Sequence, residues 1–84
     1  MLKVLFFARL REELDCPGLE LPWDPALTDL DALQDWLGAT RGERWRELLA
    51  QDNLVRARNQ SVVNGNCALH DGDEVAFFPP VTGG

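Results

Sequence analysis

Apolar and polar residues alternate at the start of the chain, and this pattern predicts a β-strand over residues 2–9. Val, Leu and Phe favour strands, and successive side chains of a strand point to opposite faces. Lys3 and Arg9 should face outward, and Leu5 and Phe7 share their parity. The inward-facing positions are then Leu2, Val4, Phe6 and Ala8.

Leucines at spacings of three and four residues predict an amphipathic helix further along the chain. These leucines are Leu30, Leu33 and Leu37. We expect the helix to span residues 29–37, with Thr28 as its N-cap and Gly38 at its C-terminal end. A second helix is expected over residues 42–50, with its apolar residues on one side.

Four further short strands are expected, over residues 19–23, 54–59, 61–63 and 74–78. In the second of these strands, Arg56 and Arg58 should face outward, which turns Val55 and Ala57 inward. In the last strand the same alternation leaves Phe78 on the outer face.

The expected order of elements is two strands, a main helix, a shorter helix and three strands. In this order the main helix carries the chain over the sheet by a crossover. The first and last strands then lie parallel at the centre. The sequence therefore predicts an α+β domain of the β-grasp, or ubiquitin-like, type, with one main helix packed on one face of a mixed sheet. The domain should cover residues 1–78, followed by an extended C-terminal tail over residues 79–84.

The expected tail has the sequence PPVTGG. Pro79 and Pro80 cannot continue a central strand and favour a stiff, extended segment. Glycine lacks a Cβ atom, so Gly83 and Gly84 can thread a channel too narrow for other residues. The Gly84 carboxylate can thus enter another protein's active site, where adenylation by ATP would open it to nucleophilic attack. We expect residues 81–84 to be mobile in the free protein, because they offer little apolar area to offset backbone ordering.

Composition narrows the classes of partner and site. The 84-residue chain has a net charge of −6, with Lys3 as its one lysine. This argues against nucleic-acid binding and favours a partner with a basic docking surface. Apolar runs fall short of the ~20 residues that span a bilayer, and we expect a cytoplasmic protein. Cys16, Cys67 and His70 are too few for a zinc site, so we expect no bound metal.

Several segments resemble the small subunit of molybdopterin synthase, a family of ubiquitin-like sulfur carriers in molybdenum cofactor biosynthesis. They are VLFFA near the start, Asn59-Gln60, and DGDEVAFFPPVTGG at the end. The resemblance implies that an E1-like enzyme uses ATP to adenylate Gly84. Sulfur from a cysteine desulfurase or sulfurtransferase system then displaces AMP and leaves a thiocarboxylate. It also implies that the chain itself holds no cofactor.

The same resemblance implies that the tail enters the large subunit of the synthase, within a heterotetramer. There the thiocarboxylate gives its sulfur to cyclic pyranopterin monophosphate, and a lysine of the large subunit is the expected catalytic group. Docking is expected through Phe7, Val62 and Phe78, with Arg11 forming a salt bridge at the rim. The tail residues that the partner would bind are Pro79, Pro80, Val81, Thr82 and Gly83.

Three alternative functions stay open at this point. The chain could carry sulfur for another product, such as a thiazole or a tungsten pterin. It could be a ubiquitin-like modifier joined to lysines of other proteins. It could also be an interaction module with an inert tail.

Overall fold

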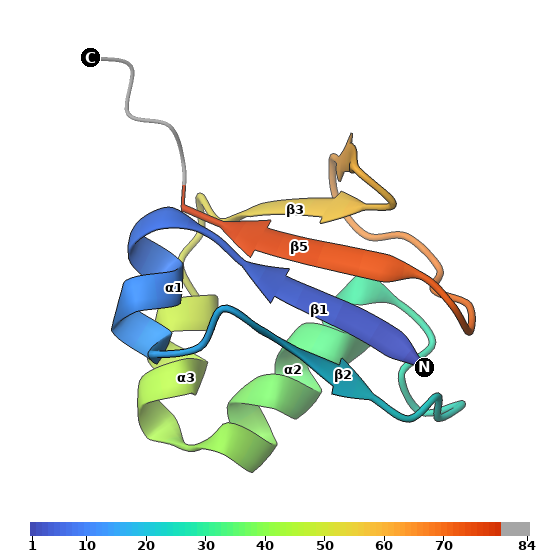
Figure 1. Cartoon of the computed structure of the whole chain (residues 1–84), viewed down its shortest axis with the longest axis horizontal. Helices are drawn as coiled ribbons and strands as arrows, with labels where there is room; N and C mark the ends of the chain where they lie inside the picture. Colours follow the sequence, from blue (N-terminus) through green and yellow to red (C-terminus); the bar gives the residue numbers. More distant parts are fainter. Residues whose placement is uncertain (80–84) are drawn as a thin grey trace.

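The computed structural model describes residues 1–79, and these form one five-stranded sheet with three helices (Figure 1). The strands lie in the order β2-β1-β5-β3-β4 across the sheet. Their bounds are Leu2–Phe6 for β1, Gly18–Leu21 for β2, Val55–Arg58 for β3, Ser61–Val63 for β4 and Glu74–Phe78 for β5. The helices are α1 over Ala8–Leu14, α2 over Leu30–Arg41 and α3 over Glu43–Leu49.

The two strands from opposite ends of the chain lie side by side at the centre of the sheet. β1 pairs with β5 in parallel, whereas β1–β2, β3–β5 and β3–β4 are antiparallel. A parallel pair needs a crossover between its strands, and α2 lies in that connection (Figure 1). The predicted β-grasp arrangement is therefore confirmed, including the central parallel pair. Residues 80–84 lie outside the described part. The predicted mobility of residues 81–84 concerns these residues and stays a prediction.

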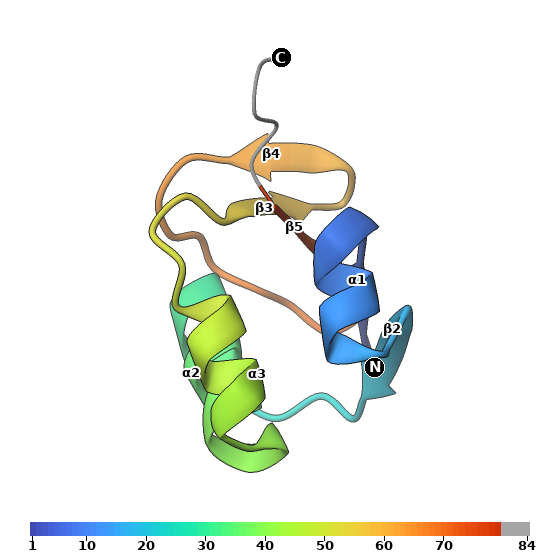
Figure 2. The same ribbon diagram turned by 90° about the vertical axis from the view of Figure 1, so that its left-hand side faces the viewer.

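The core lies between the helices and one face of the sheet. The leucine stripe of α2 is buried, and the Phe6 ring contacts Phe77 and the edge of the Trp45 ring in α3, with centroid distances of 5.9 and 5.3 Å. Helices α1 and α3 lie at the same end of the sheet, as the turned view shows (Figure 2). Because all three helices contribute to this one core, the opposite face of the sheet carries no helix of the described chain.

Helix α1 replaces the end of the predicted first strand. Ala8 has a positive φ of 55°, which ends the extended backbone of β1 and starts the helix. Ala8 is therefore exposed at the start of α1 and does not face inward, so that prediction was wrong. Leu10 and Leu14, four residues apart, are both buried. Their spacing is typical of one face of a helix and indicates why this segment is helical.

Helix α2 is longer than predicted at its C-terminal end. Its N-cap is Asp29, whose side chain accepts a hydrogen bond of 2.8 Å from the backbone N–H of Ala32, so Thr28 is not the cap. Gly38 lies inside the helix, where an added Cβ atom would lie 3.2 Å from the Cα atom of Arg46. Its small size thus allows α3 to pack closely against α2. The helix ends instead before Gly42, which has a φ of 107°.

Strand β3 faces the opposite way from the prediction. Its register pairs Arg56 with the buried Phe77 of β5, and paired residues of neighbouring strands point to the same face. Arg56 and Arg58 therefore lie on the helix side, and Val55 and Ala57 on the outer face. Ala57 is buried but lies outside the core cluster, as this orientation requires. Alternation separates the two sets of side chains, but it does not say which set meets the helices.

Candidate functional site: the outer face of the sheet

Apolar side chains gather on the outer face of the sheet in two rows that follow the strand register. One row runs across all five strands, and the other lies beside it at the end of the sheet where β5 ends. Paired positions share a face, so each row is a set of neighbours. The first row consists of Val62, Ala57, Ala76 and Leu5, and Gly18, which has no side chain, lies at its end on β2. The second row consists of Val55, Phe78 and Phe7.

Phe7 and Phe78 form an aromatic pair at the carboxyl ends of the two central strands. Their ring centroids lie 6.3 Å apart with an interplanar angle of 76°, an edge-to-face geometry that aromatic rings favour. The backbone N–H of Phe7 donates to the carbonyl of Phe77 at 3.2 Å, which extends the β1–β5 ladder to this pair. Phe7 is 44% exposed and Phe78 is half-buried. The pair therefore presents an apolar surface directly before Pro79.

Val62 supplies the far end of the first row from the edge strand β4. It pairs with Ala57 of β3 and is 61% exposed. The tight turn between β3 and β4 consists of Asn59 and Gln60, both with positive φ, as a two-residue hairpin requires. The Asn59 side chain accepts from the backbone N–H of Glu74 at 2.9 Å, which ties this turn to β5.

The structure thus places the three predicted docking residues on one face. Phe7 and Phe78 are in contact, and Val62 lies on the same face across β3 and β5. Sequence reasoning missed Val55 and Ala57 because it turned β3 over. The available indication was their apolar character beside two arginines, but the facing of β3 depends on its pairing with β5.

Arg11 lies on α1 close to the aromatic pair. Its backbone N–H donates to the carbonyl of Phe7 at 3.3 Å, and its side chain is exposed. An exposed arginine on the helix that follows Phe7 suits a charged contact at the rim of an interface. Pro79 lies at the same end and lines a groove of about 410 Å³ together with Ala8, Leu10 and Leu54. The predicted tail residues Pro80, Val81, Thr82, Gly83 and Gly84 lie outside the described part.

The opposite end of the outer face is charged. Lys3 pairs in register with Glu20 of β2 and Glu74 of β5, so one cation lies between two carboxylates. The apolar part of the face is therefore confined to the end from which the chain continues past Pro79. The outer face therefore has a charged end near the N-terminus and an apolar end at Phe7 and Phe78.

The turn before β5 is fixed by Asp73. Its carboxylate accepts hydrogen bonds from the Asn59 side chain at 3.1 Å and from the backbone N–H of His70 at 2.9 Å. Burial acts to raise the pKa of Asp73, but these hydrogen bonds and the charges of Arg58 and His70 outweigh it and lower the pKa below the ordinary 3.8. His70 and Asp73 thus stabilise the turn before β5.

The described residues hold neither a metal-binding cluster nor a membrane-spanning helix. Within residues 1–79, acidic, cysteine and histidine side chains do not come together in a group of three that could hold a metal ion. Helices of this same part of the chain are too short and too polar to cross a membrane.

Comparison with known proteins gives one family. The sequence profile of the ThiS family matches residues 4–84. The molybdopterin synthase sulfur carrier subunit of Escherichia coli (strain K12) is 44% identical over 84 residues, which cover 100% of both chains.

Two solved structures are also similar over nearly their whole length. SAMP1 of Haloferax volcanii is 30% identical with a TM-score of 0.68, over 99% of this chain and 98% of that chain. The complex of subunits 1 and 2 of molybdopterin-converting factor from Helicobacter pylori 26695 contains a chain that is 25% identical. Its TM-score is 0.65, over 99% of this chain and 97% of that chain. The resemblance noted at the two ends of the sequence is thereby confirmed. The chain belongs to the ThiS family and groups with its molybdopterin synthase sulfur carrier subunits.

Proposed function

We propose that this chain is the sulfur-carrier subunit of a molybdopterin synthase and acts in molybdenum cofactor biosynthesis. The observation that carries the proposal is the apolar outer face at the end of β5, directly before the C-terminal segment. The full-length likeness to the Escherichia coli sulfur carrier subunit supports it. The family match extends through Gly83 and Gly84, the residues that the proposed chemistry uses.

The reactive group of this proposal is the carboxylate of Gly84. A carboxylate is a poor electrophile, so an E1-like enzyme first joins it to AMP at the expense of ATP. A sulfur nucleophile supplied by a cysteine desulfurase system then attacks the acyl carbon, and AMP leaves with the bonding electron pair. The product is a thiocarboxylate, which holds a nucleophilic sulfur at the end of the chain.

The outer face serves as the docking surface for the large subunit of the synthase. Burying the apolar rows removes them from water, and a central aromatic pair is the kind of group that dominates binding energy. Docking through the apolar end of the face, at Phe7 and Phe78, brings the segment after Pro79 to the partner. There the sulfur passes to cyclic pyranopterin monophosphate, and the acid–base groups for this step, a lysine among them, belong to the large subunit.

The remaining partners and the setting form part of the same proposal. The assembly is a heterotetramer with two copies of each subunit, located in the cytoplasm. The chain holds no cofactor of its own, and ATP is consumed by the activating enzyme. The chain is a cosubstrate of the synthase and not its catalyst.

Intact mass spectrometry tests the proposed chemistry. Incubation with ATP, the activating enzyme and a sulfur source should raise the mass by about 16 Da, because one carboxylate oxygen is replaced by sulfur through an activated acyl group. The matched control is a chain that lacks Gly84, which should keep its original mass. An unchanged mass of the full chain, with the activating enzyme shown to be active on a known carrier, would contradict the proposal.

Conjugation to other proteins is a second candidate function. It is favoured by the likeness to SAMP1 of Haloferax volcanii at 30% identity and to the structure of small archaeal modifier protein 1 from the same organism at 28% identity. Attack on the activated Gly84 by a lysine amine in place of sulfur would form an amide bond. An immunoblot of cells that express the tagged chain separates the two functions. High-mass bands that depend on Gly84 support a modifier, and a single band at the mass of the free chain supports a carrier.

A further inference from the structure

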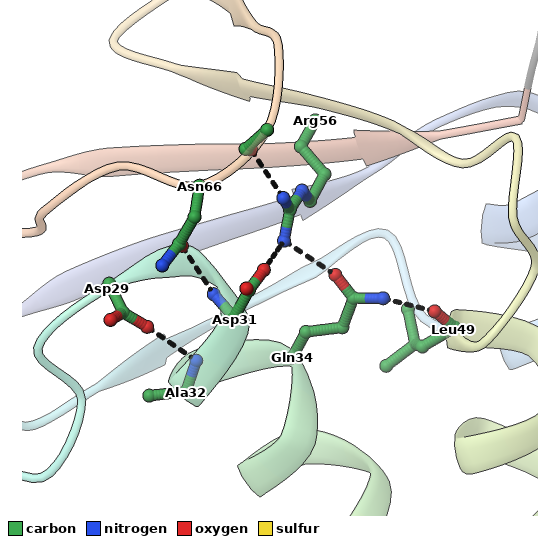
Figure 3. A network of polar contacts seen from close by, with 8 residues as sticks. Asp29, Asp31, Ala32, Gln34, Leu49, Arg56 and Asn66 are labelled. Atoms are coloured by element: carbon green, nitrogen blue, oxygen red, sulfur yellow. Dashed lines mark hydrogen bonds and ion pairs between the residues drawn. The ribbon is translucent and has the colours of Figure 1, made fainter.

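Arg56 occupies an unusual place for a charged residue of a small sheet. It lies on the helix side of β3, and its side chain is only 14% exposed. Its Nη1 atom donates to Asp31 Oδ1 at 2.6 Å and to Gln34 Oε1 at 3.1 Å, both on α2. Its Nη2 atom donates to the backbone carbonyl of Gly65, in the loop after β4 (Figure 3). One guanidinium therefore joins β3 to α2 and to the loop after β4.

The segment that Arg56 holds lies at the edge of the sheet. β4 is a three-residue edge strand, and β3 is its one partner in the sheet. Between this segment and α2 lies a groove of about 680 Å³. Residues 62–65 line one side of the groove, Asp31 and Asp35 line the other, and Arg56 bridges them. β4 and the loop after it thus lie beside this groove, and the Arg56 side chain spans the groove to α2.

Two neighbouring contacts complete the network. The backbone N–H of Asp31 donates to Asn66 Oδ1 at 3.0 Å, and the Gln34 side chain donates to the carbonyl of Leu49 (Figure 3). The first contact ties the loop after β4 to the N-terminus of α2, and the second ties α2 to the end of α3. The N-terminal part of α2 that Arg56 contacts is therefore itself held in place by hydrogen bonds to neighbouring elements.

We propose that Arg56 is a positioning residue for the docking face, because it holds β4 so that Val62 stays in line with Ala57 and Ala76. The inference rests on the proposed function, in which the outer face binds the large subunit. Arg56 lies on the opposite side of the sheet from that face and acts through Val62. Arginine suits the task because its planar group reaches acceptors on two elements at once, whereas lysine offers a single point of attachment.

A double-mutant cycle tests this inference on the full chain. The affinity for the large subunit is measured for Arg56→Met, Val62→Ala and the double variant, at a temperature where all are folded. Arg56→Met should weaken binding about fivefold or more, and Val62→Ala should then weaken it at least about threefold less than it does alone, as expected for coupled residues. The parallel cycle with Phe7→Ala should be additive to within about twofold, because Phe7 lies beyond β5 on the far side of the face.

The matched control is Arg58→Met. Arg58 lies on the same strand and the same face, but its guanidinium donates to the carbonyl of Ala68 at 2.9 Å, further along the loop after β4, and not to Gly65. Amide exchange of residues 61–66 in the free protein should be at least about threefold faster in Arg56→Met than in Arg58→Met. If Arg56→Met fails to fold, Arg56→Lys carries both measurements, since it keeps the charge and the aliphatic stem.

The outcomes separate this inference from the proposed function. Additive effects of Arg56 and Val62, or an equal loss of affinity in Arg58→Met, would overturn the role of Arg56 while leaving the proposed function intact. A wild-type chain that does not bind the large subunit would overturn the proposed function instead. The exchange measurement would then decide by itself whether Arg56 holds β4.

Discussion

Phe78→Ala is expected to weaken binding to the large subunit far more than it destabilises the fold. Phe78 is half-buried on the outer face, and its described ring partner there is Phe7. Burying half of a Phe side chain contributes about 1 kcal/mol, and an edge-to-face pair adds about 0.5–1.5 kcal/mol. The free energy of unfolding should therefore fall by about 1.5–2.5 kcal/mol.

The cost in binding should be larger, because the partner buries the rest of the ring. Truncating a central interface aromatic costs about 2–4 kcal/mol, which corresponds to an increase in Kd of about 30- to 1000-fold. Urea unfolding gives the stability term and isothermal titration with the large subunit gives the binding term. Both measurements are made on the same preparation.

The neighbouring residue supplies a matched control. Phe77 differs from Phe78 by one position, points to the helix side and is fully buried. Phe77→Ala should lower the free energy of unfolding by about 3–5 kcal/mol, and the fraction that remains folded should keep near-normal affinity. If Phe78→Ala destabilises the chain as much as Phe77→Ala and leaves the affinity unchanged, the assignment of the outer face as a docking surface is wrong.

Three further outcomes are expected. Deletion of Gly84 should abolish the mass increase and sulfur transfer with an unchanged Tm, and full activity of the deletion would end the carrier hypothesis. Replacement of Pro79 and Pro80 together by Gly should leave thiocarboxylate formation possible but weaken binding to the large subunit several-fold, because a stiff arm loses less entropy on binding; equal titration curves would contradict this. The folded-state pKa of Asp73 is lowered, so its contribution to stability is present above the ordinary pKa of 3.8 and is lost as pH falls through the folded pKa. Urea unfolding at several pH values should show that Asp73→Asn removes this fall in the free energy of unfolding at low pH. The control variant Asp35→Asn should keep it.

Local patterns were sufficient for most elements. The leucine spacing of α2 indicates a helix because one helical turn is close to four residues. That spacing can be read from the segment alone. The β-grasp order follows from the same local evidence, since a crossover helix between strands restricts the topology. The reactive tail that Pro79-Pro80 and Gly83-Gly84 indicate also rests on the sequence alone, and it stays a prediction.

Tertiary structure alone decided which way β3 faces and where α2 ends. The alternation along β3 was correct, but its facing was inverted. Two arginines on the helix side are favourable only because acceptors lie there: Asp31, Gln34 and Gly65 for Arg56, and Ala68 for Arg58. Gly38 has the properties of a helix end, yet it lies inside α2 because α3 packs against it. In both cases the free energy depends on partners distant in the chain, which local periodicity does not contain. The apolar docking face, with Val55 beside Phe78 and Ala57 beside Val62, is therefore a product of the fold.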